Sequence, residues 1–170
     1  MTIRIAMWSG PRNLSTAMMR SFGARPDTIV SDEPFYGAYL KHTAADQPMK
    51  DAVIASMDCD WHSVAQALSG PALTPIWYQK HMAHHMVGPI GPADLRGFIH
   101  AFLIRTPDRV INSYAAKRIT VTADDLGYAR QRDWFDREAD RRGHAPPVID
   151  SADVLADPAV LLAKLCTALG

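Results

Sequence analysis

The sequence has few cysteines, no excess charge of either sign and no long apolar run, and each absence excludes a class of protein. The two cysteines, Cys59 and Cys166, lie far apart and outside any C-x-x-C pair. They predict reduced thiols in the core of a cytoplasmic protein, not a disulfide framework. The 18 basic and 18 acidic residues cancel, so a general attraction to nucleic acid or to an anionic membrane is not expected. No apolar run approaches the roughly 20 residues of a membrane-spanning helix, and the first residues do not predict a secretory leader.

The chain also lacks the Walker A motif, G-x-x-x-x-G-K-[ST], which argues against an ordinary ATPase or GTPase. The segment nearest to that motif runs from Gly10 to Thr16 and has neither the second glycine nor the lysine. It does follow an apolar strand, Ile3–Trp8, and it leads into a helix that is predicted to begin at a hydroxyl cap. A strand, turn and helix in this order point backbone N–H groups at one spot, which favours a bound phosphate or sulfate. Arg12, within the turn, adds a cation.

At 170 residues, of which 48% are apolar, the chain is expected to form a single domain, residues 1–170, around one core. Strand and helix patterns alternate along it, which predicts an α/β fold with three αβα layers and a parallel five-stranded sheet. The expected strands are Ile3–Trp8, Thr28–Ser31, Ile76–Gln79, Ala101–Ile104 and Val148–Ile149. The expected helices are Ser15–Gly23, Met49–Met57, Trp61–Leu68, Pro107–Arg118, Ala123–Arg142 and Pro158–Leu169.

Charged residues follow the predicted strands, and ligands of open α/β sheets collect at the carboxyl ends of the strands. These residues are Arg12 after the first strand, Asp32 and Glu33 after the second, Lys80 and His81 after the third, Arg105 after the fourth and Asp150 after the fifth. Each has an ordinary explanation when taken singly, such as a surface ion pair or a helix cap. Their common position predicts that one edge of the sheet gathers cations together with acid or base groups.

The fourth strand leads into a second candidate anion site. Thr106 and Pro107 suit the start of a helix, which places Ser113 about two turns inside it. The spacing i, i+4, i+8 puts Arg109, Ser113 and Lys117 on one face of this helix, next to the strand end that carries Arg105. A second phosphate is expected there, and a solvated basic helix face is the alternative.

These two segments resemble the sulfotransferases that use 3′-phosphoadenosine 5′-phosphosulfate (PAPS). The run from Pro11 to Thr16 is similar to their first-strand loop, although Leu14 stands where a glycine is usual. Arg105 and Ser113 match the arginine at a strand end and the serine eight residues later in the 3′-phosphate motif of that family. The resemblance implies a P-loop, nucleotide-kinase-like fold, PAPS as the co-substrate and no metal. It also predicts that a basic segment, usual at the C-terminal end of the family, is missing from this chain.

By the same resemblance, Arg12 and the backbone amides of Asn13, Leu14, Ser15 and Thr16 would hold the 5′-phosphosulfate. The hydroxyl groups of Ser15 and Thr16 would add contacts. The 3′-phosphate would be held by Arg105 and Ser113. The acceptor would be a small molecule or a carbohydrate with a hydroxyl or amine group, with neither nucleic acid nor membrane as partner; the oligomeric state is not predicted.

Two residues are candidates for the base that takes the acceptor's proton. Glu33 resembles the Glu-Pro that follows the second strand of several carbohydrate sulfotransferases. His81 resembles the Lys-x-His of the small-molecule branch, although Lys80 and His81 are adjacent here and would therefore point in different directions. Glu33 is slightly favoured, with Lys80 and His81 as neighbours that stabilise charge.

Two other functions compete with sulfuryl transfer. His81, His84 and His85 could bind zinc on one helix face, as in a metal-dependent hydrolase, although H-E-x-x-H is absent and no carboxylate lies inside the cluster. A nucleotide-binding or phosphate-binding module without sulfuryl chemistry is the other alternative.

Overall fold

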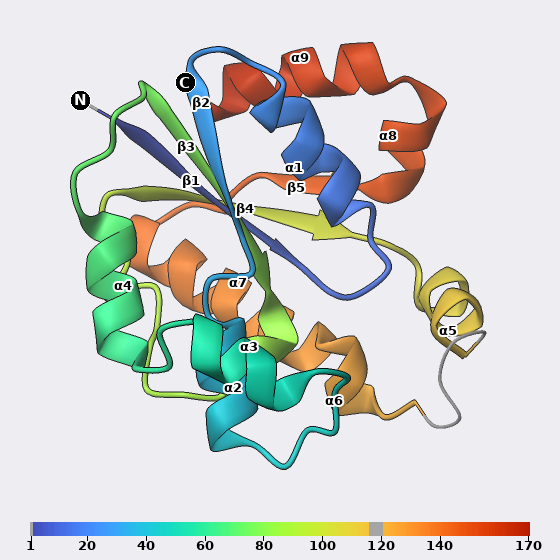
Figure 1. Ribbon diagram of the computed structural model, residues 1–170. Coiled ribbons are helices and arrows are strands. Elements are labelled where there is room, and N and C mark those ends of the chain that lie inside the picture. The colour runs from blue at the N-terminus through green and yellow to red at the C-terminus, as the bar shows by residue number, and fades with distance from the viewer. Residues whose placement is uncertain (1, 116–120) are drawn as a thin grey trace.

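The computed structural model describes residues 2–115 and 121–170, and it contains a parallel five-stranded sheet (Figure 1). The strand order is β2-β3-β1-β4-β5, and every neighbouring pair is parallel. The strands are β1 (Ile3–Ser9), β2 (Thr28–Asp32), β3 (Ile76–Met82), β4 (Phe98–Ile104) and β5 (Val148–Asp150). The predicted α/β fold with a parallel sheet is therefore confirmed.

Helices cover both faces of the sheet, which gives the three predicted layers (Figure 1). On one face lie α1 (Ser15–Gly23), α8 (Ser151–Ala156) and α9 (Pro158–Leu169). On the other face lie α2 (Tyr36–His42), α3 (Lys50–Ser56), α4 (Trp61–Ser69), the short 3-10 turn η1 (Ala83–His85), α6 (Ala123–Leu126) and α7 (Tyr128–Arg142). Past the end of β4, α5 (Pro107–Ala115) stands beside the sheet.

The side chains of the sheet divide the core into two apolar clusters, because successive strand residues face opposite sides. On the α1 face, Ile5 and Met7 of β1 pack with Phe22 and Tyr78. On the α7 face, Trp8 packs with residues from α2, α4 and α7. Trp8 is fully buried. The central strand β1 is thus covered on both sides, which holds the loop after it in a fixed place.

The third strand is longer than its apolar run predicted. It was expected to end at Gln79, but β3 continues to Met82, because Lys80 and His81 pair with Met7 and Trp8 of β1. The expectation that Lys80 and His81 follow the strand is therefore wrong. Both side chains project from within the sheet.

The long helix expected over Ala123–Arg142 is two helices, because Gly127 breaks it with a left-handed backbone (φ +71°). A Cβ atom there would lie 3.0 Å from the backbone nitrogen of His84, so both the conformation and the close approach favour glycine. Within the described residues α5 ends at Ala115. Lys117 and Arg118, which were expected in that helix, lie outside those residues.

The structure tests the expected burial of the two cysteines and the expected absence of a membrane-spanning helix. Cys59 is buried, as expected, but Cys166 is exposed on α9, so its assignment to the core is wrong. Within residues 2–115 and 121–170, no helix has both the length and the apolar character needed to cross a membrane.

Candidate functional site

The loop that follows β1 holds two residues in the left-handed backbone region, Arg12 (φ +60°) and Leu14 (φ +63°). This region costs an ordinary L-residue roughly 1–2 kcal/mol, and left-handed residues in a turn before a helix are typical of backbone anion sites. Leu14 is the N-cap of α1 and no side chain caps this helix end. The predicted hydroxyl cap is therefore wrong: Ser15 is already inside the helix.

This loop, Arg105 just past β4 and Ser113 in the last turn of α5 line one pocket with a volume of about 310 Å³. Arg12 Nε donates a hydrogen bond to Ser113 Oγ at 2.9 Å, and Arg105 Nη1 donates to the backbone oxygen of Arg12 at 2.7 Å. The two segments identified in the sequence thus converge, although Arg12 and Ser113 are 101 positions apart. The pocket is lined by Arg12, Asn13, Leu14, Ser15, Thr16, Ala17, Arg105 and Ser113.

The pocket is cationic, and its guanidinium groups are not engaged by acids. Among the ion pairs formed by the described residues, none includes Arg12 or Arg105. Arginine is suited to this task because its planar donors match the oxygens of phosphate and sulfate. A site of two unpaired guanidinium groups at a helix N-terminus favours an anion with more than one charged group.

Of the loop residues, Asn13 turns its side chain away from solvent. The residue is 1% exposed, and Nδ2 donates to the backbone oxygen of Leu103 at 2.9 Å. Asn13 can therefore serve a ligand through its backbone N–H, while its side chain fastens the loop to β4. Ser15 is also buried, whereas Thr16 is exposed at the rim.

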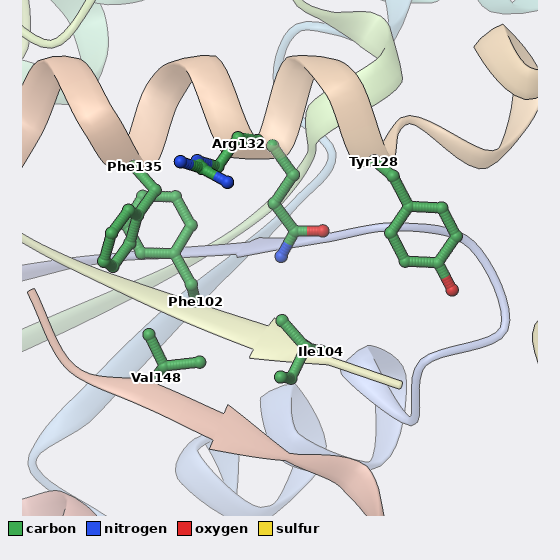
Figure 2. Close-up of a pocket in the computed structure, with 7 residues that line it drawn as sticks. Phe102, Ile104, Tyr128, Arg132, Phe135 and Val148 are labelled. Atoms are coloured by element: carbon green, nitrogen blue, oxygen red, sulfur yellow. The ribbon is translucent and has the colours of Figure 1, made fainter. Parts of the chain in front are cut away.

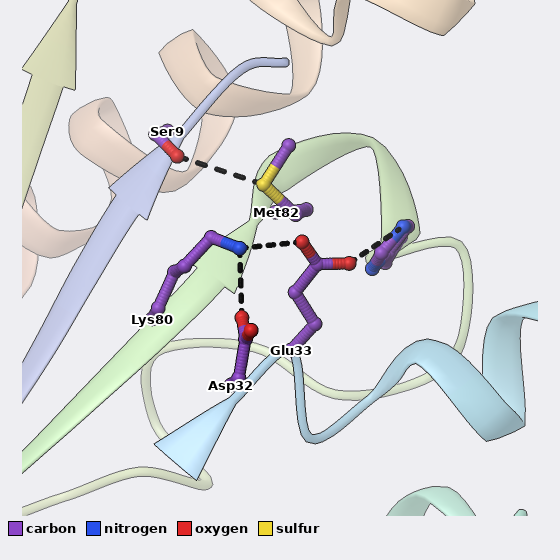
Figure 3. Close-up of polar contacts among 6 residues, drawn as sticks. Ser9, Asp32, Glu33, Lys80 and Met82 are labelled. Carbon is purple, nitrogen blue, oxygen red and sulfur yellow. Dashed lines mark hydrogen bonds and ion pairs between the residues drawn. The ribbon is translucent and has the colours of Figure 1, made fainter. Parts of the chain in front are cut away.

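A second polar cluster lies at the ends of β2 and β3 (Figure 3). Lys80 Nζ lies 2.6 Å from Glu33 Oε1 and 2.7 Å from Asp32 Oδ1, and the lysine side chain is 4% exposed. Burial by itself would lower the pKa of Lys80, but the two carboxylates outweigh it and raise that pKa above its ordinary value. Lys80 is thus a fixed cation beside a partly exposed carboxylate.

Glu33 is held in place by its backbone. It has a left-handed conformation (φ +49°), and its N–H donates to the carbonyl of Lys80 at 3.0 Å. Its own carbonyl accepts from the N–H of Tyr36 at 2.9 Å, which closes a turn into α2. Strained residues that the surrounding bonds fix in this way cluster at functional sites. The side chain of Glu33 is 28% exposed, so a bound molecule can reach it.

Comparison with known proteins agrees with these features. The sequence profile of the family described as "Sulfotransferase domain" matches residues 3–170. The chain belongs to this sulfotransferase family. Two Arabidopsis thaliana relatives are the branched-chain-amino-acid aminotransferase-like proteins 2 and 1, which are 32% and 34% identical over 163 and 165 residues. Each match covers 95% of this chain but 29% of the relative, so this chain spans less than a third of the length of those proteins.

In this sulfotransferase domain His81 does not lie with Lys80 and Glu33. Adjacent strand residues face opposite sides, and the His81 ring is 1% exposed and stacks on Trp8 with ring centroids 4.5 Å apart. Burial, and then the neighbouring His100, lower the pKa of His81 to about 3. The geometry therefore brings Glu33 and Lys80 together and places His81 in the core.

The other two histidines of the suggested zinc cluster also pack against rings. His84 and His85 meet edge to face at 4.3 Å, and His85 stacks on Tyr36 at 4.8 Å. The described part of the sulfotransferase domain contains no group of three His, Cys, Asp or Glu side chains arranged to hold a metal ion. His85 Nε2 does lie 3.9 Å from Glu33 Oε2, a proximity that the sequence spacing did not reveal.

An apolar pocket of about 260 Å³ lies on the other side of β4 (Figure 2). Its aromatic and aliphatic walls come from β4, β5 and α7, and no sequence motif predicted it. Tyr128, on this wall, donates from Oη to the backbone oxygen of Arg105 at 2.9 Å, so the wall is bonded to a residue that lines the cationic pocket. The lining residues are Phe102, Ile104, Tyr128, Gln131, Arg132, Phe135 and Val148.

Proposed function

We propose that this sulfotransferase domain moves the sulfuryl group of PAPS to a hydroxyl or amine group of a small-molecule or carbohydrate acceptor. The observation that carries this proposal is the convergence of Arg12, Arg105 and Ser113 in one pocket. An adenosine with anionic groups at both its 3′ and 5′ positions offers one such group to each of two neighbouring cationic centres. ATP carries its charges on a single chain and matches this arrangement less well.

In the proposed complex the pocket has two half-sites. The 5′ half-site is Arg12 with the backbone amides of residues 13–16, and it would hold the phosphosulfate at the N-terminus of α1. The 3′ half-site is Arg105 with Ser113, and it would hold the 3′-phosphate. Ser113 Oγ already accepts a hydrogen bond from Arg12, so the two half-sites are in direct contact.

The proposed transfer is a single in-line displacement at sulfur. The acceptor oxygen or nitrogen forms a bond to sulfur while the bond from sulfur to the 5′-phosphate oxygen breaks, and the acceptor's proton passes to the Glu33 carboxylate. The products are the sulfated acceptor and 3′-phosphoadenosine 5′-phosphate (PAP). Such a step depends on alignment and on the neutralisation of charge at the leaving oxygen. Arg12 and the loop amides would supply that charge, so the proposal includes no metal.

Glu33 is the proposed base because it is the partly exposed carboxylate at the strand edge whose backbone is locked. Lys80 would keep it aligned, since one oxygen is bound at 2.6 Å while the other faces His85 at 3.9 Å. His81 has no part in this proposal, because its ring lies among Trp8 and Phe35.

Calorimetric titration with PAP, without magnesium, tests the donor assignment. The wild type is expected to prefer PAP over ATP, and Arg12→Ala and Arg105→Ala are each expected to weaken PAP binding about tenfold or more, the size of a lost charge-assisted hydrogen bond. Arg20→Ala is the matched control, because Arg20 is exposed in the last turn of α1 and does not line the pocket. Equal affinity for ATP, or full PAP affinity in both pocket variants, would contradict the proposal and favour a general phosphate-binding module.

A further inference from the structure

Three consecutive carbonyl groups at the end of β4 each accept a hydrogen bond from a side chain of another element. The carbonyls belong to residues 103–105, where the chain leaves the sheet and reaches the 3′ half-site. In order, the three carbonyls accept from Asn13 Nδ2 at 2.9 Å, Ser151 Oγ at 2.6 Å and Tyr128 Oη at 2.9 Å. The carbonyl of Leu103 also accepts from Gln131 Nε2 of α7 at 3.0 Å. We refer to Asn13, Ser151 and Tyr128 as the carbonyl donors of β4.

The carbonyl donors come from three separate parts of the chain. Asn13 lies in the loop after β1, Tyr128 begins α7 and Ser151 begins α8. Ser151 is 1% exposed, and its Oγ also lies 3.3 Å from the backbone oxygen of Asn13, so one hydroxyl reaches both the loop and β4. Figure 2 shows Tyr128 on α7 beside Ile104 at the end of β4.

These bonds connect the backbones of the two half-sites. Asn13 and Ser151 join the loop of the 5′ half-site to β4, and Tyr128 binds the carbonyl of Arg105 itself. Arg105 then returns a bond from Nη1 to the backbone oxygen of Arg12. Buried and partly buried side-chain bonds of this kind to backbone carbonyls fix relative positions, because a broken bond of this kind can leave a polar group unpaired.

We infer that Tyr128, Ser151 and the side chain of Asn13 are positioning residues that set the spacing between the 5′ and 3′ half-sites. This inference rests on the proposed function, because the spacing matters only to a ligand with an anionic group at each end. Once one end of such a ligand is bound, binding of the second end is an intramolecular event. The affinity gained from this second contact depends on how well the spacing of the half-sites matches the ligand. Rigid spacing also places the phosphosulfate for in-line attack.

The inference predicts an effect on one ratio of affinities. Removing a carbonyl donor loosens the spacing, so a ligand that spans both half-sites binds more weakly, while a ligand that occupies one half-site is nearly unaffected. A general loss of packing would lower both affinities alike. The ratio therefore distinguishes a positioning role from a merely structural one.

The test is calorimetric titration with PAP and with adenosine 5′-monophosphate, which lacks the 3′-phosphate. Ser151→Ala and Tyr128→Phe are each expected to lower the ratio of the two affinities about fivefold, the effect of one hydrogen bond. Ser151→Thr keeps the hydroxyl and is expected to retain most of the wild-type ratio. Ser69→Ala is the matched control, because its hydroxyl binds one carbonyl within α4, and it should leave the ratio unchanged.

Each outcome separates the inference from the proposed function. A wild type with no preference for PAP over the monophosphate would overturn the proposed function, and this inference with it. A wild type with the preference, and Ser151→Ala and Tyr128→Phe variants that keep it, would overturn this inference alone. Tyr128 is partly exposed, so Tyr128→Phe supplies the measurement if Ser151→Ala fails to fold.

Discussion

Lys80 Nζ lies 2.6 Å from Glu33 Oε1, which places a buried ammonium against the carboxylate proposed as the base. An ammonium that is 4% exposed requires such a partner, because an unpaired buried charge costs several kcal/mol. Asp32 shares the same ammonium at 2.7 Å but is 53% exposed. The two carboxylates therefore differ: Asp32 holds Lys80 from the solvent side, whereas the second oxygen of Glu33 lies 3.9 Å from Nε2 of the buried His85.

Glu33→Gln is expected to lower the rate of sulfuryl transfer by about 10²- to 10⁴-fold, the usual contribution of a general base. The amide keeps the shape of the side chain but cannot take the acceptor's proton. PAP affinity is expected to stay within about twofold, because Glu33 does not line the pocket of Arg12 and Arg105. Steady-state kinetics with labelled PAPS, together with PAP titration, checks both statements.

Asp32→Asn is the comparison for that variant, since it removes a carboxylate that shares Lys80 yet lies largely in solvent. Its transfer rate should fall less than tenfold, in keeping with the small value of exposed ion pairs. An equal loss of transfer rate in Glu33→Gln and Asp32→Asn would mean that the rate depends on the negative charge around Lys80, and that Glu33 is not the base.

His81→Phe tests the placement of this histidine in the core. Phenylalanine retains a flat ring against Trp8, where the rings now stack at 4.5 Å, but it cannot carry a proton. The transfer rate is expected to stay within about threefold of the wild type, because no proton passes through this position in the proposed step. A loss as large as that of Glu33→Gln would restore His81 as a candidate base.

The sequence was sufficient to predict the fold class and the convergence of Arg12 with Arg105. The fold class follows from the alternation of strand and helix patterns, and the convergence follows from the rule that the carboxyl ends of parallel strands meet at one edge. The placement of His81 could not be predicted in the same way, because the apolar run stops at Gln79 while pairing with β1 carries the strand on to Met82. Strand ends depend on the partner strand, which a single segment does not contain.

Backbone conformation was the other feature that the sequence did not reveal. Nothing in the residue types at positions 14 and 33 signals a positive φ, since glycine is the usual sign of it. At position 127 a glycine is present, but the residues on both sides of it favour a helix, so the sequence predicted one continuous helix instead of α6 and α7. The carbonyl donors Tyr128 and Ser151 act on backbone atoms far away in sequence, and such contacts leave no motif.

Leu14→Gly and Leu14→Ala together measure the backbone strain in the loop that follows β1. Both variants remove the same packing of the leucine against the core, but glycine accepts a φ of +63° freely and alanine does not. The glycine variant is expected to be about 1 kcal/mol more stable than the alanine variant in urea denaturation. At Ala163, in the middle of α9, the order should reverse: Ala163→Gly is expected to cost about 1 kcal/mol. Alanine more stable than glycine at position 14 would contradict the left-handed conformation.

Acid is expected to destabilise the domain through its buried histidines. Burial is the first cause that lowers the pKa of His81 to about 3 and the pKa values of His84 and His100 to about 4. Unfolded, the same imidazoles titrate near 6.5. Below pH 6.5 the unfolded chain therefore binds protons that the folded chain does not, and the free energy of unfolding falls as the pH drops toward 4.

Each of these imidazoles contributes a slope of up to about 1.4 kcal/mol per pH unit between its unfolded and folded pKa values. Urea denaturation at several pH values from 7.5 to 4.5 measures the total slope. His81→Phe removes one such group while keeping the stacked ring. Between pH 6 and 4.5, the free energy of unfolding of this variant should therefore change less steeply with pH than that of the wild type. The difference in slope should be about 1.4 kcal/mol per pH unit, which corresponds to one proton. Above pH 7.5 the two proteins should respond to pH alike, because these histidines are neutral in both states there. An unchanged slope in His81→Phe would mean that His81 is protonated in the folded protein. The assignment of a buried, neutral ring to His81 would then be wrong.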